Sequence, residues 1–337
     1  MEKTVDRLDA PYIPIEHGTR WQRMMHWLRN PRHVKMLIWG ICRYVILLAL
    51  SYIVLTPFIF MISMSIRSPW DNLDPSVMWI PRNYSTQVFA FTFRAMAFWR
   101  SLWETMKIGV FTGVLQVIVT CVVGYGFARF KFPGRGLLFA MVLFTLIVPM
   151  PTILSGFYML MHDFRIFGIS TGQKLLDTYL PFWLPALFGL GLRSAIFIYF
   201  YRQFFRGQPK ELSEAATVDG CGYFGTFVRI MLPSAGAIII TVFLFALVWQ
   251  WNETLMPSTF NVGKQVTLAV RLSGLNSSLS SSISAGQAEA LGSGDNPYTK
   301  ISMIQAGCLI MIAPILLVYI VLQRFFTESI ARTGIVG

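Results

Sequence analysis

Residues 201–236 read YRQFFRGQPKELSEAATVDGCGYFGTFVRIMLPSAG, and this stretch decides the fold. It predicts two short helices that meet at a glycine-rich corner. Pro209 can begin the first helix and Gly220 is a typical residue to end it, while Pro233 suits the first turn of the helix that follows. One face of the first helix carries small and apolar residues, namely Leu212, Ala215 and Ala216. The second has apolar residues at helical spacing, namely Phe224, Phe227, Val228 and Met231.

The chain on both sides of this stretch is too apolar for a water-soluble protein. Apolar residues make up 55% of the 337 residues and charged residues 13%, against about 45–50% and about 25% in soluble domains. Mean hydropathy is +0.57. Polar side chains are too few to cover a globule of this length, so the composition predicts a protein that crosses a membrane several times.

Six tracts are long and apolar enough to cross a bilayer, since a transmembrane helix needs about 20 such residues. The sequence therefore predicts an all-α membrane protein with six transmembrane helices. The tracts are 44–66, 108–128, 136–161, 178–201, 230–252 and 301–323.

The tract 178–201 is the weakest, because Arg193 divides it into two apolar runs that are each too short to span. One central arginine costs about 2.5–3.5 kcal/mol on insertion scales, and the surrounding Leu, Ile and Phe residues offset this cost. We therefore expect the tract to insert. Helix-breaking residues before the arginine predict a helix that is kinked or partly unwound there, at Pro181, Pro185, Gly189 and Gly191.

Positive charge sets the predicted orientation. With the N-terminus inside, the inner segments hold 17 Lys and Arg in 92 residues, and the outer segments hold 10 in 105. The excess of Lys and Arg marks the cytoplasmic side, so both termini are expected to be cytoplasmic. The inner segments are 1–43, 129–135, 202–229 and 324–337, and the outer segments are 67–107, 162–177 and 253–300.

Three segments outside the spans have sequence patterns that predict local structure. The tail 1–43 shows no signal peptide, so we expect the first span to direct insertion. Its stretch 20–30 is amphipathic and fits a helix on the inner membrane surface or, equally, a helix packed on protein. The outer segment 67–107 has too many aromatic residues for a linker, which predicts that it folds against the spans. In the segment 108–323, which holds five of the six predicted spans, the Ser- and Gly-rich stretch 273–296 predicts a flexible outer loop.

No pattern for catalysis, nucleotide binding or a metal is present. The Walker A and HExxH patterns are missing, and the histidines are scattered. The four cysteines lie in spans or on the inner side without metal spacing, which predicts reduced thiols. A net charge of +12 would suit a nucleic-acid binder, but the bias of Lys and Arg to one side of the membrane argues against one. We therefore predict no catalytic residue, metal or cofactor on this chain.

Pattern alone leaves the role of the loop 202–229 open. Its helices fit a docking element on the cytoplasmic face or, equally, an interfacial segment on which charged residues are only solvated. However, the loop resembles the EAA loop of ABC importer permeases at several fixed positions. These are Glu214-Ala215-Ala216, Asp219-Gly220, Ile230 and Leu232-Pro233.

Other stretches are similar to the carbohydrate branch of that family, the maltose-type permeases. The resemblance covers about residues 40–337 and is strongest over 195–255. The long N-terminal tail, the ending SIARTGIVG and the Ser- and Gly-rich outer loop depart from the family pattern. The matching stretches are YGFAR at 125–129, FPGR at 132–135, RQFF at 202–205, PKEL at 209–212, WNE at 251–253 and QRFF at 323–326.

The resemblance implies a type I importer permease fold and a set of partners. A second permease subunit would complete a heterodimer, two ATPase subunits would dock on the cytoplasmic side, and an extracytoplasmic binding protein would deliver a carbohydrate. ATP and Mg would bind on the ATPase subunits alone. The residues that the resemblance assigns to ATPase coupling are Glu214, Ala215, Ala216, Asp219, Gly220 and Pro233.

Residues for the solute path follow from charge inside the spans. Polar groups there face a cavity or the interior of the bundle, which favours Arg193, with Asn252 and Glu253 after the fifth span. Arg193 could equally pair with a backbone carbonyl or extend toward water. Three aromatic residues fit sugar stacking as well as positions at the membrane interface, namely Tyr52, Trp249 and Trp251.

The sequence therefore predicts a permease subunit for a sugar or oligosaccharide in the inner membrane of a prokaryote. A permease for another solute, such as a polyamine, phosphate or amino acid, is the alternative within this fold. A standalone secondary transporter would respond to ion gradients and often shows an internal repeat, which is not evident here. A membrane enzyme would need a catalytic cluster, and the sequence shows none.

Overall fold

The computed structural model describes most of the chain. The described residues are 21, 29 and 31–333, apart from 69, 75, 78, 167–168, 171–173, 262, 264 and 276–296. The predicted amphipathic stretch 20–30 and the Ser- and Gly-rich loop 273–296 therefore lie almost wholly outside the described residues.

The chain divides into two compact units, Met1–Phe60 and Met61–Gly337. The long helix α2 (Pro31–Ser65) begins in the first unit and ends in the second, and it contains almost all of the predicted first span. Pro57 lies inside this helix, as is common in helices that cross membranes.

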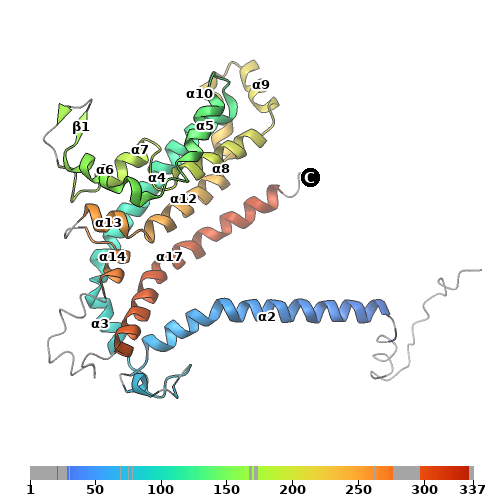
Figure 1. The fold of residues 1–337 in the computed structure, drawn as a ribbon. Helices are drawn as coiled ribbons and strands as arrows, with labels where there is room; N and C mark the ends of the chain where they lie inside the picture. Colours follow the sequence, from blue (N-terminus) through green and yellow to red (C-terminus); the bar gives the residue numbers. More distant parts are fainter. Residues whose placement is uncertain are drawn as a thin grey trace, which may run out of the picture. The chain divides into compact units, whose positions relative to one another are not determined.

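The second unit is mostly helical, and its one described sheet is a pair of two-residue antiparallel strands in which Arg165 lies opposite Ser170 (Figure 1). Its elements are η1 (Asp71–Leu73), α3 (Gln87–Ala95), α4 (Phe98–Arg129), α5 (Arg135–Phe144), α6 (Met150–His162), β1 (Arg165–Ile166), β2 (Ile169–Ser170), α7 (Leu180–Leu187), α8 (Ser194–Gly207), α9 (Glu211–Val218), α10 (Tyr223–Thr226), the π-helical η2 (Phe227–Met231), α11 (Leu232–Ser234), α12 (Gly236–Trp251), α13 (Leu255–Phe260), α14 (Leu268–Ser273) and α17 (Pro297–Thr333).

Helix α4 is the centre of this unit and packs against α7, α8 and α12. The approach to α8 is close at Gly124, where a Cβ would lie 2.5 Å from the Cβ of Tyr201 and 3.1 Å from the backbone nitrogen of Arg202. A side chain at Gly124 is therefore excluded by backbone atoms that cannot move aside. The core between α4, α8, η2 and α12 consists of buried aromatic and aliphatic residues, among them Tyr125, Phe197, Tyr201, Phe205, Phe227, Met231 and Val242.

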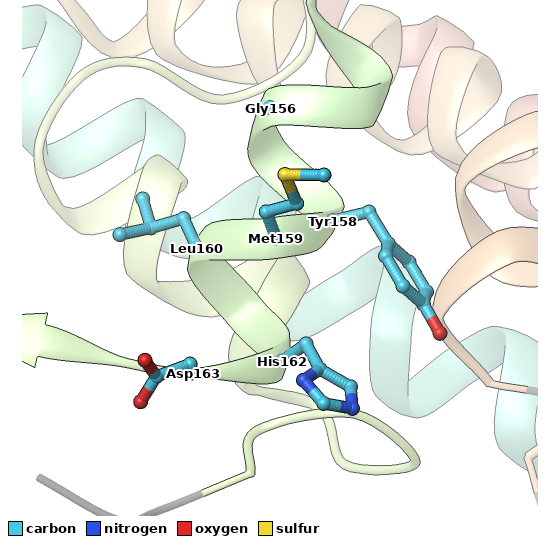
Figure 2. A pocket seen from close by; sticks show the side chains of 6 residues that line it. All are labelled: Gly156, Tyr158, Met159, Leu160, His162 and Asp163. Atoms are coloured by element: carbon cyan, nitrogen blue, oxygen red, sulfur yellow. The ribbon is translucent and has the colours of Figure 1, made fainter. Parts of the chain in front are cut away.

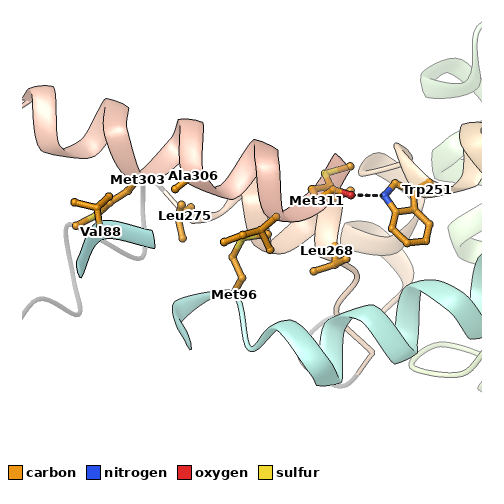
Figure 3. Packing of buried hydrophobic residues seen from close by; sticks show 10 residues of the cluster. Val88, Met96, Trp251, Leu268, Leu275, Met303, Ala306 and Met311 are labelled. Atoms are coloured by element: carbon orange, nitrogen blue, oxygen red, sulfur yellow. Dashed lines mark hydrogen bonds between the residues drawn. The ribbon is translucent and has the colours of Figure 1, made fainter. Parts of the chain in front are cut away.

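The predicted outer segment 67–107 is folded and packs on α14 and α17. Val88 and Met96 are buried with Leu268, Met303 and Met311 in one apolar cluster (Figure 3). Hydrogen bonds cross the same region: Trp251 Nε1 donates to the Met311 carbonyl (3.0 Å), and the Leu268 N–H donates to Thr105 Oγ1 (2.9 Å). Trp251 is thus buried and bonded, so neither of its two predicted alternatives, sugar stacking or a position at the membrane interface, fits this residue.

Some of the six predicted spans are single long helices in the structure, and others are divided into shorter helices. By length and composition, α2, α4 and α17 could each cross a membrane, and the bent pair Tyr223–Ser234 and Gly236–Trp251 would make a fourth span. The two other tracts, 136–161 and 178–201, are each divided between two shorter helices. The count of six therefore stays a prediction.

Prolines and glycines explain the breaks within these tracts. The tract 136–161 is interrupted between α5 and α6, where Pro149 has extended backbone and Pro151 lies in the first turn of α6. The tract 178–201 is interrupted between α7 and α8, as its glycines and prolines predict. In the tract 230–252 the bend at Ala235 is 76°, so the straight helix starts at Gly236 rather than at Ile230.

The contact at Gly124 gives the first testable prediction. Gly124→Ala should lower the free energy of unfolding by about 1–3 kcal/mol, because the new methyl group collides with α8. Gly126→Ala is the matched control, since no atom lies within 4 Å of the added Cβ on the same helix. Thermal unfolding of the purified protein would measure both. Equal melting temperatures for the two variants would contradict the close packing of α4 on α8.

Candidate functional site

The predicted docking loop, 202–229, contains the end of α8, a short connector, the helices α9 and α10, and the first residues of η2. The connector is 208–210, and α9 starts at Glu211, so Pro209 lies just before the helix rather than in its first turn. Arg129, the last residue of α4, donates from Nη2 to the carbonyl oxygens of Gln208 (2.9 Å) and Pro209 (3.3 Å). These charge-assisted hydrogen bonds tie the connector to α4.

Helix α9 ends where its sequence predicts. Gly220 has a φ of +80°, in the left-handed region that glycine adopts without steric cost. Its N–H donates to the Thr217 carbonyl (3.1 Å), and that of Cys221 donates to the Ala216 carbonyl (2.8 Å). This pair of bonds is a Schellman motif, which satisfies the last carbonyls of the helix. Asp219, the C-cap residue, is exposed beside it.

The surface of α9 is acidic and apolar. Ala216 is buried, whereas Glu214, Ala215, Leu212 and Val218 are exposed, so one of the three residues predicted to share an apolar face turns inward. Glu214 lies in the first turn, where a carboxylate stabilises the helix dipole. The helix thus presents small, apolar and negatively charged groups to solvent.

The predicted apolar face of the second helix is partly wrong. Phe227 and Met231 are buried, but Phe224 is 79% exposed and Val228 is 39% exposed. The reason is the π-helical turn η2, which follows α10 directly and has a wider residue spacing than an α-helix. Phe224 and its neighbour Tyr223 therefore lie at the surface and extend the apolar part of the loop.

Three aromatic rings join this loop to two long helices, and we call them the aromatic anchor. Tyr125 of α4, Phe205 of α8 and Phe227 of η2 have ring centroids 4.8 Å (Tyr125–Phe227), 5.3 Å (Tyr125–Phe205) and 6.3 Å (Phe205–Phe227) apart. Such pairs contribute about 0.5–1.5 kcal/mol each beyond burial. The anchor couples the position of the loop to that of α4 and α8. Reasoning from the sequence missed it, because all three residues read only as core.

Pro233 lies in the short helix α11, which directly follows η2 in the chain. It lies in the first turn, as predicted, and its side chain is exposed. Because proline has no N–H, it removes one helical hydrogen bond just after η2 and before the 76° bend into α12. Pro233 therefore shapes the corner of the loop.

Arg193 lies at the break between α7 and α8. Its φ is +56°, which is unusual for a residue with a side chain and is typical of functional sites. The guanidinium lies over the ring of Trp249, 4.7 Å from its centroid, in a cation–π contact. Trp249 in turn stacks on Phe197 and Phe245, at centroid distances of 5.2 and 5.6 Å. A rigid aromatic platform thus holds the exposed cation.

Gln116 of α4 stabilises this break and was missed by sequence reasoning. The residue is 1% exposed, and its Nε2 donates to the Leu192 carbonyl (2.8 Å) and to Ser194 Oγ (3.0 Å). It thus satisfies a backbone carbonyl that the interrupted helix leaves unpaired. A single glutamine within an apolar tract was the available signal.

The other two residues predicted for the solute path have local roles. Asn252 donates from Nδ2 to the Val248 carbonyl (2.9 Å) of its own helix. Glu253 Oε1 accepts from the N–H groups of Leu255 (2.9 Å) and Met256 (3.2 Å), which begin α13. In the described part of the chain neither side chain is hydrogen-bonded or ion-paired with Arg193. The structure therefore does not bring the three together by direct contact.

A separate cavity of about 660 Å³ lies at the C-terminal end of α6. Tyr158 and His162 point to one side of the helix and their rings stack at 6.2 Å, while Asp163 lies on the other side (Figure 2). No group of three metal-binding side chains occurs among the described residues. The cavity contains none of the predicted site residues, and it is lined by Gly156, Tyr158, Met159, Leu160, His162 and Asp163.

Comparisons with known proteins agree with the resemblance seen in the sequence. Residues 116–332 match the family described as binding-protein-dependent transport system inner membrane component. The arabinooligosaccharides transport system permease protein AraQ of Bacillus subtilis is 28% identical over 272 residues, or 79% of this chain and 82% of AraQ. The polygalacturonan/rhamnogalacturonan transport system permease protein YtcP of Bacillus subtilis is 26% identical over 302 residues, or 90% of this chain and 98% of YtcP.

Two further similarities extend the picture. The alpha-glucoside transport system permease protein AglG of Rhizobium meliloti is 31% identical over 181 residues, or 53% of this chain and 46% of AglG. A chain in the crystal structure of a bacterial ABC transporter for the acidic polysaccharide alginate shares the fold, with a TM-score of 0.68 at 21% identity over 92% of this chain and 99% of that chain. Since the family match covers well over half of the sequence, this chain belongs to the inner-membrane permease components of binding-protein-dependent transport systems.

Proposed function

We propose that this chain is one of two permease subunits in an ATP-driven importer of a sugar or oligosaccharide. It forms half of the translocation path, and a second permease subunit forms the other half. Two ATPase subunits, which bind ATP and Mg, dock on the cytoplasmic face, and an extracytoplasmic binding protein delivers the solute. The names of the relatives, which refer to arabinooligosaccharides, alpha-glucosides and polygalacturonan, support a carbohydrate. Both termini are cytoplasmic in this proposal.

The observation that carries the proposal is the exposed helix α9 on a rigid support. Ala215 has a small exposed side chain, which permits close approach of a partner. Glu214 can accept a charge-assisted hydrogen bond from an arginine or lysine of an ATPase subunit, worth about 1.5–3 kcal/mol. Tyr223 and Phe224 add apolar surface beside it.

The aromatic anchor gives α9 its mechanical role. ATP-driven closure of the ATPase subunits would move α9 and α10, and the rings of Tyr125, Phe205 and Phe227 would pass this movement to α4 and α8. The chain itself contributes no hydrolysis in this scheme. Its part is to convert a displacement at the docking loop into a change in the path.

Arg193 is the residue that we place in the solute path. Facing lipid would cost several kcal/mol, so the exposed guanidinium turns to the interior of the two-subunit assembly. Its contact with Trp249 leaves the hydrogen-bond donors of the guanidinium edge for sugar hydroxyl or carboxylate groups. Asn252 and Glu253 would then line the same path near the outer end of α12, with their side chains already bonded to backbone.

Co-purification tests the assembly. The tagged chain should purify with a second permease and two ATPase copies, and Glu214→Ala should weaken retention of the ATPase by about tenfold without reducing membrane insertion. Glu211→Ala removes the same charge from the same helix and should retain the ATPase. Stable active transport by this chain reconstituted alone would refute the proposal. Equal loss with both variants would show that Glu214 acts only through net charge.

The end of α9 offers a second test. Gly220→Ala should cost about 1–2 kcal/mol, because an L-residue is strained in the left-handed region, and the Schellman bonds should open. Gly222→Ala is the control, since its φ is −70° and nothing lies within 4 Å of an added Cβ. We expect faster amide hydrogen exchange at Gly220 and Cys221, with lower solute-stimulated ATPase activity, in the first variant alone. Unchanged exchange would contradict this account of the helix end.

For the path, Arg193→Ala should reduce solute uptake by about tenfold while the complex still assembles. Arg193→Lys should restore part of the uptake, because an ammonium group keeps the charge but not the planar fork of donors. Uptake of radiolabelled oligosaccharide into proteoliposomes and the subunit ratio of the complex are the two readouts. Loss of assembly would make Arg193 a contact between subunits, and full uptake by Arg193→Ala would place the path elsewhere.

A further inference from the structure

Three arginines gather at the predicted cytoplasmic ends of α5 and α8, and none of them forms an ion pair with a described carboxylate. Arg202 and Arg206 are four residues apart on α8, which places them on one face, and Arg135 begins α5, which packs against α8. In the sequence, the only acidic residues between Glu104 and Glu211 are two aspartates, both in the predicted outer half. We call Arg135, Arg202 and Arg206 the arginine cluster.

No described carboxylate forms an ion pair with any of the three. Arg206 lies in the last turn of α8, where the helix dipole favours a cation, and Arg135 Nη1 donates to the Phe130 carbonyl (3.0 Å), but neither contact supplies a negative charge. Burial lowers the pKa of Arg202, and the charges of Arg206 and Arg135 lower it further. An arginine stays protonated in spite of such shifts, so three like charges persist at this position.

Arg202 is half-buried and oriented by its surroundings. Its guanidinium lies over the ring of Phe139 of α5, with Cζ 4.0 Å from the centroid, and its Nε is shielded from solvent without a hydrogen-bond partner. The nearby N-terminus of α5 adds to the positive potential, since its N-cap residue Gly134 offers no side-chain cap. The region is therefore built to favour an anion.

An apolar surface adjoins the arginine cluster on α5. Leu137 (63%), Leu138 (47%) and Met141 (54%) are exposed within two turns of Arg135. Arg202 directly follows the apolar tract 178–201, which places the cluster at the predicted boundary between hydrocarbon and cytoplasm. Positive charge beside exposed apolar surface at this depth fits a molecule with an anionic head and hydrocarbon tails.

We propose that the arginine cluster between α5 and α8 binds the phosphate headgroup of an anionic phospholipid of the inner leaflet. The acyl chains lie along the exposed side of α5, and the phosphate oxygens accept hydrogen bonds from Arg202 and Arg206. Acidic residues of an ATPase subunit are the rival occupant. The adjoining apolar side chains favour the lipid, because its acyl chains can cover them while its phosphate reaches the arginines, whereas a soluble subunit supplies only the negative charge.

The site would act close to the docking loop. Helix α8 continues from Arg206 into the connector 208–210, which Arg129 holds. A bound anion would reduce the repulsion within the arginine cluster. It would thereby stabilise the C-terminal end of α8, which the connector joins to α9. The lipid composition of the membrane would thereby influence the docking loop, independently of which solute is carried.

The test measures lipid retention by the assembled importer in detergent with native mass spectrometry. Phosphatidylglycerol should remain bound and phosphatidylcholine should not. Arg202→Gln and Arg206→Gln should each lower phosphatidylglycerol affinity about fivefold, and the double variant about 25-fold. Arg229→Gln, which removes an exposed arginine from η2 on the same predicted face, should match the wild type.

Further measurements distinguish a lipid phosphate from a free anion and from carboxylates of an ATPase subunit. Inorganic phosphate at millimolar concentration should not displace the lipid, and displacement would assign the arginine cluster to a free anion and overturn the lipid proposal. Lipid binding that disappears when the ATPase subunits are present would assign it to the protein interface and overturn it as well. Equal retention by the double variant, or equal loss in Arg229→Gln, would show that no specific site exists. Melting temperatures of the variants, which should stay within a few degrees of the wild type, confirm that they fold.

Discussion

The packing of α4 against the helices around it, above all α8, is the constraint on which the rest of this structure depends. Gln116 fills the break before α8, Gly124 admits the backbone at Tyr201, Tyr125 joins the aromatic anchor, and Arg129 binds the connector. Gln116 and Tyr125 are nine residues apart, about two and a half helical turns, so these contacts lie on different sides of the helix. Helix α4 thus touches the interrupted span, the docking loop and the link between them.

That arrangement explains how a chain with two interrupted tracts can stay ordered. A helix broken inside a membrane leaves carbonyls without partners, which is tolerated where another element supplies donors. Gln116, which is buried, does so between α7 and α8. The break also frees Arg193 from helical geometry, so that its side chain can reach over Trp249. The irregular backbone at this break therefore positions the charge of Arg193 over the ring of Trp249.

The sequence was sufficient for features that depend on local chemistry. The unwound stretch before Arg193, the end of α9 at Gly220 and the place of Pro233 follow from residue type and spacing, and the structure agrees with each. Of the six apolar tracts, 44–66, 108–128 and 301–323 lie almost wholly in single long helices. The interruption at Pro149 and Pro151 could have been predicted in the same way, because two prolines so close together seldom continue a helix.

Other features depend on which distant residues meet, and a single sequence does not contain that information. Tyr125, Phe205 and Phe227 are ordinary apolar residues until the fold joins them. Phe224 was expected on one apolar face with Phe227 and Met231 because α-helical spacing was extended across a turn that is π-helical. Glu253 reads as a free carboxylate, yet it caps α13, and Trp251 reads as a stacking surface, yet it is buried and bonded.

The distribution of charge gives the last step of the argument. Arg193 and the arginine cluster are cations without carboxylate partners among the described residues, and Glu214 is an exposed anion on a helix that ends abruptly. These charged groups would add little to the stability of the isolated protein. Under the proposals made above, each would gain its counterpart from outside the chain: a solute in the path, a phosphate at the membrane surface, or a basic group on an ATPase subunit. In those proposals, these charges of the permease are neutralised only once it is assembled in a membrane.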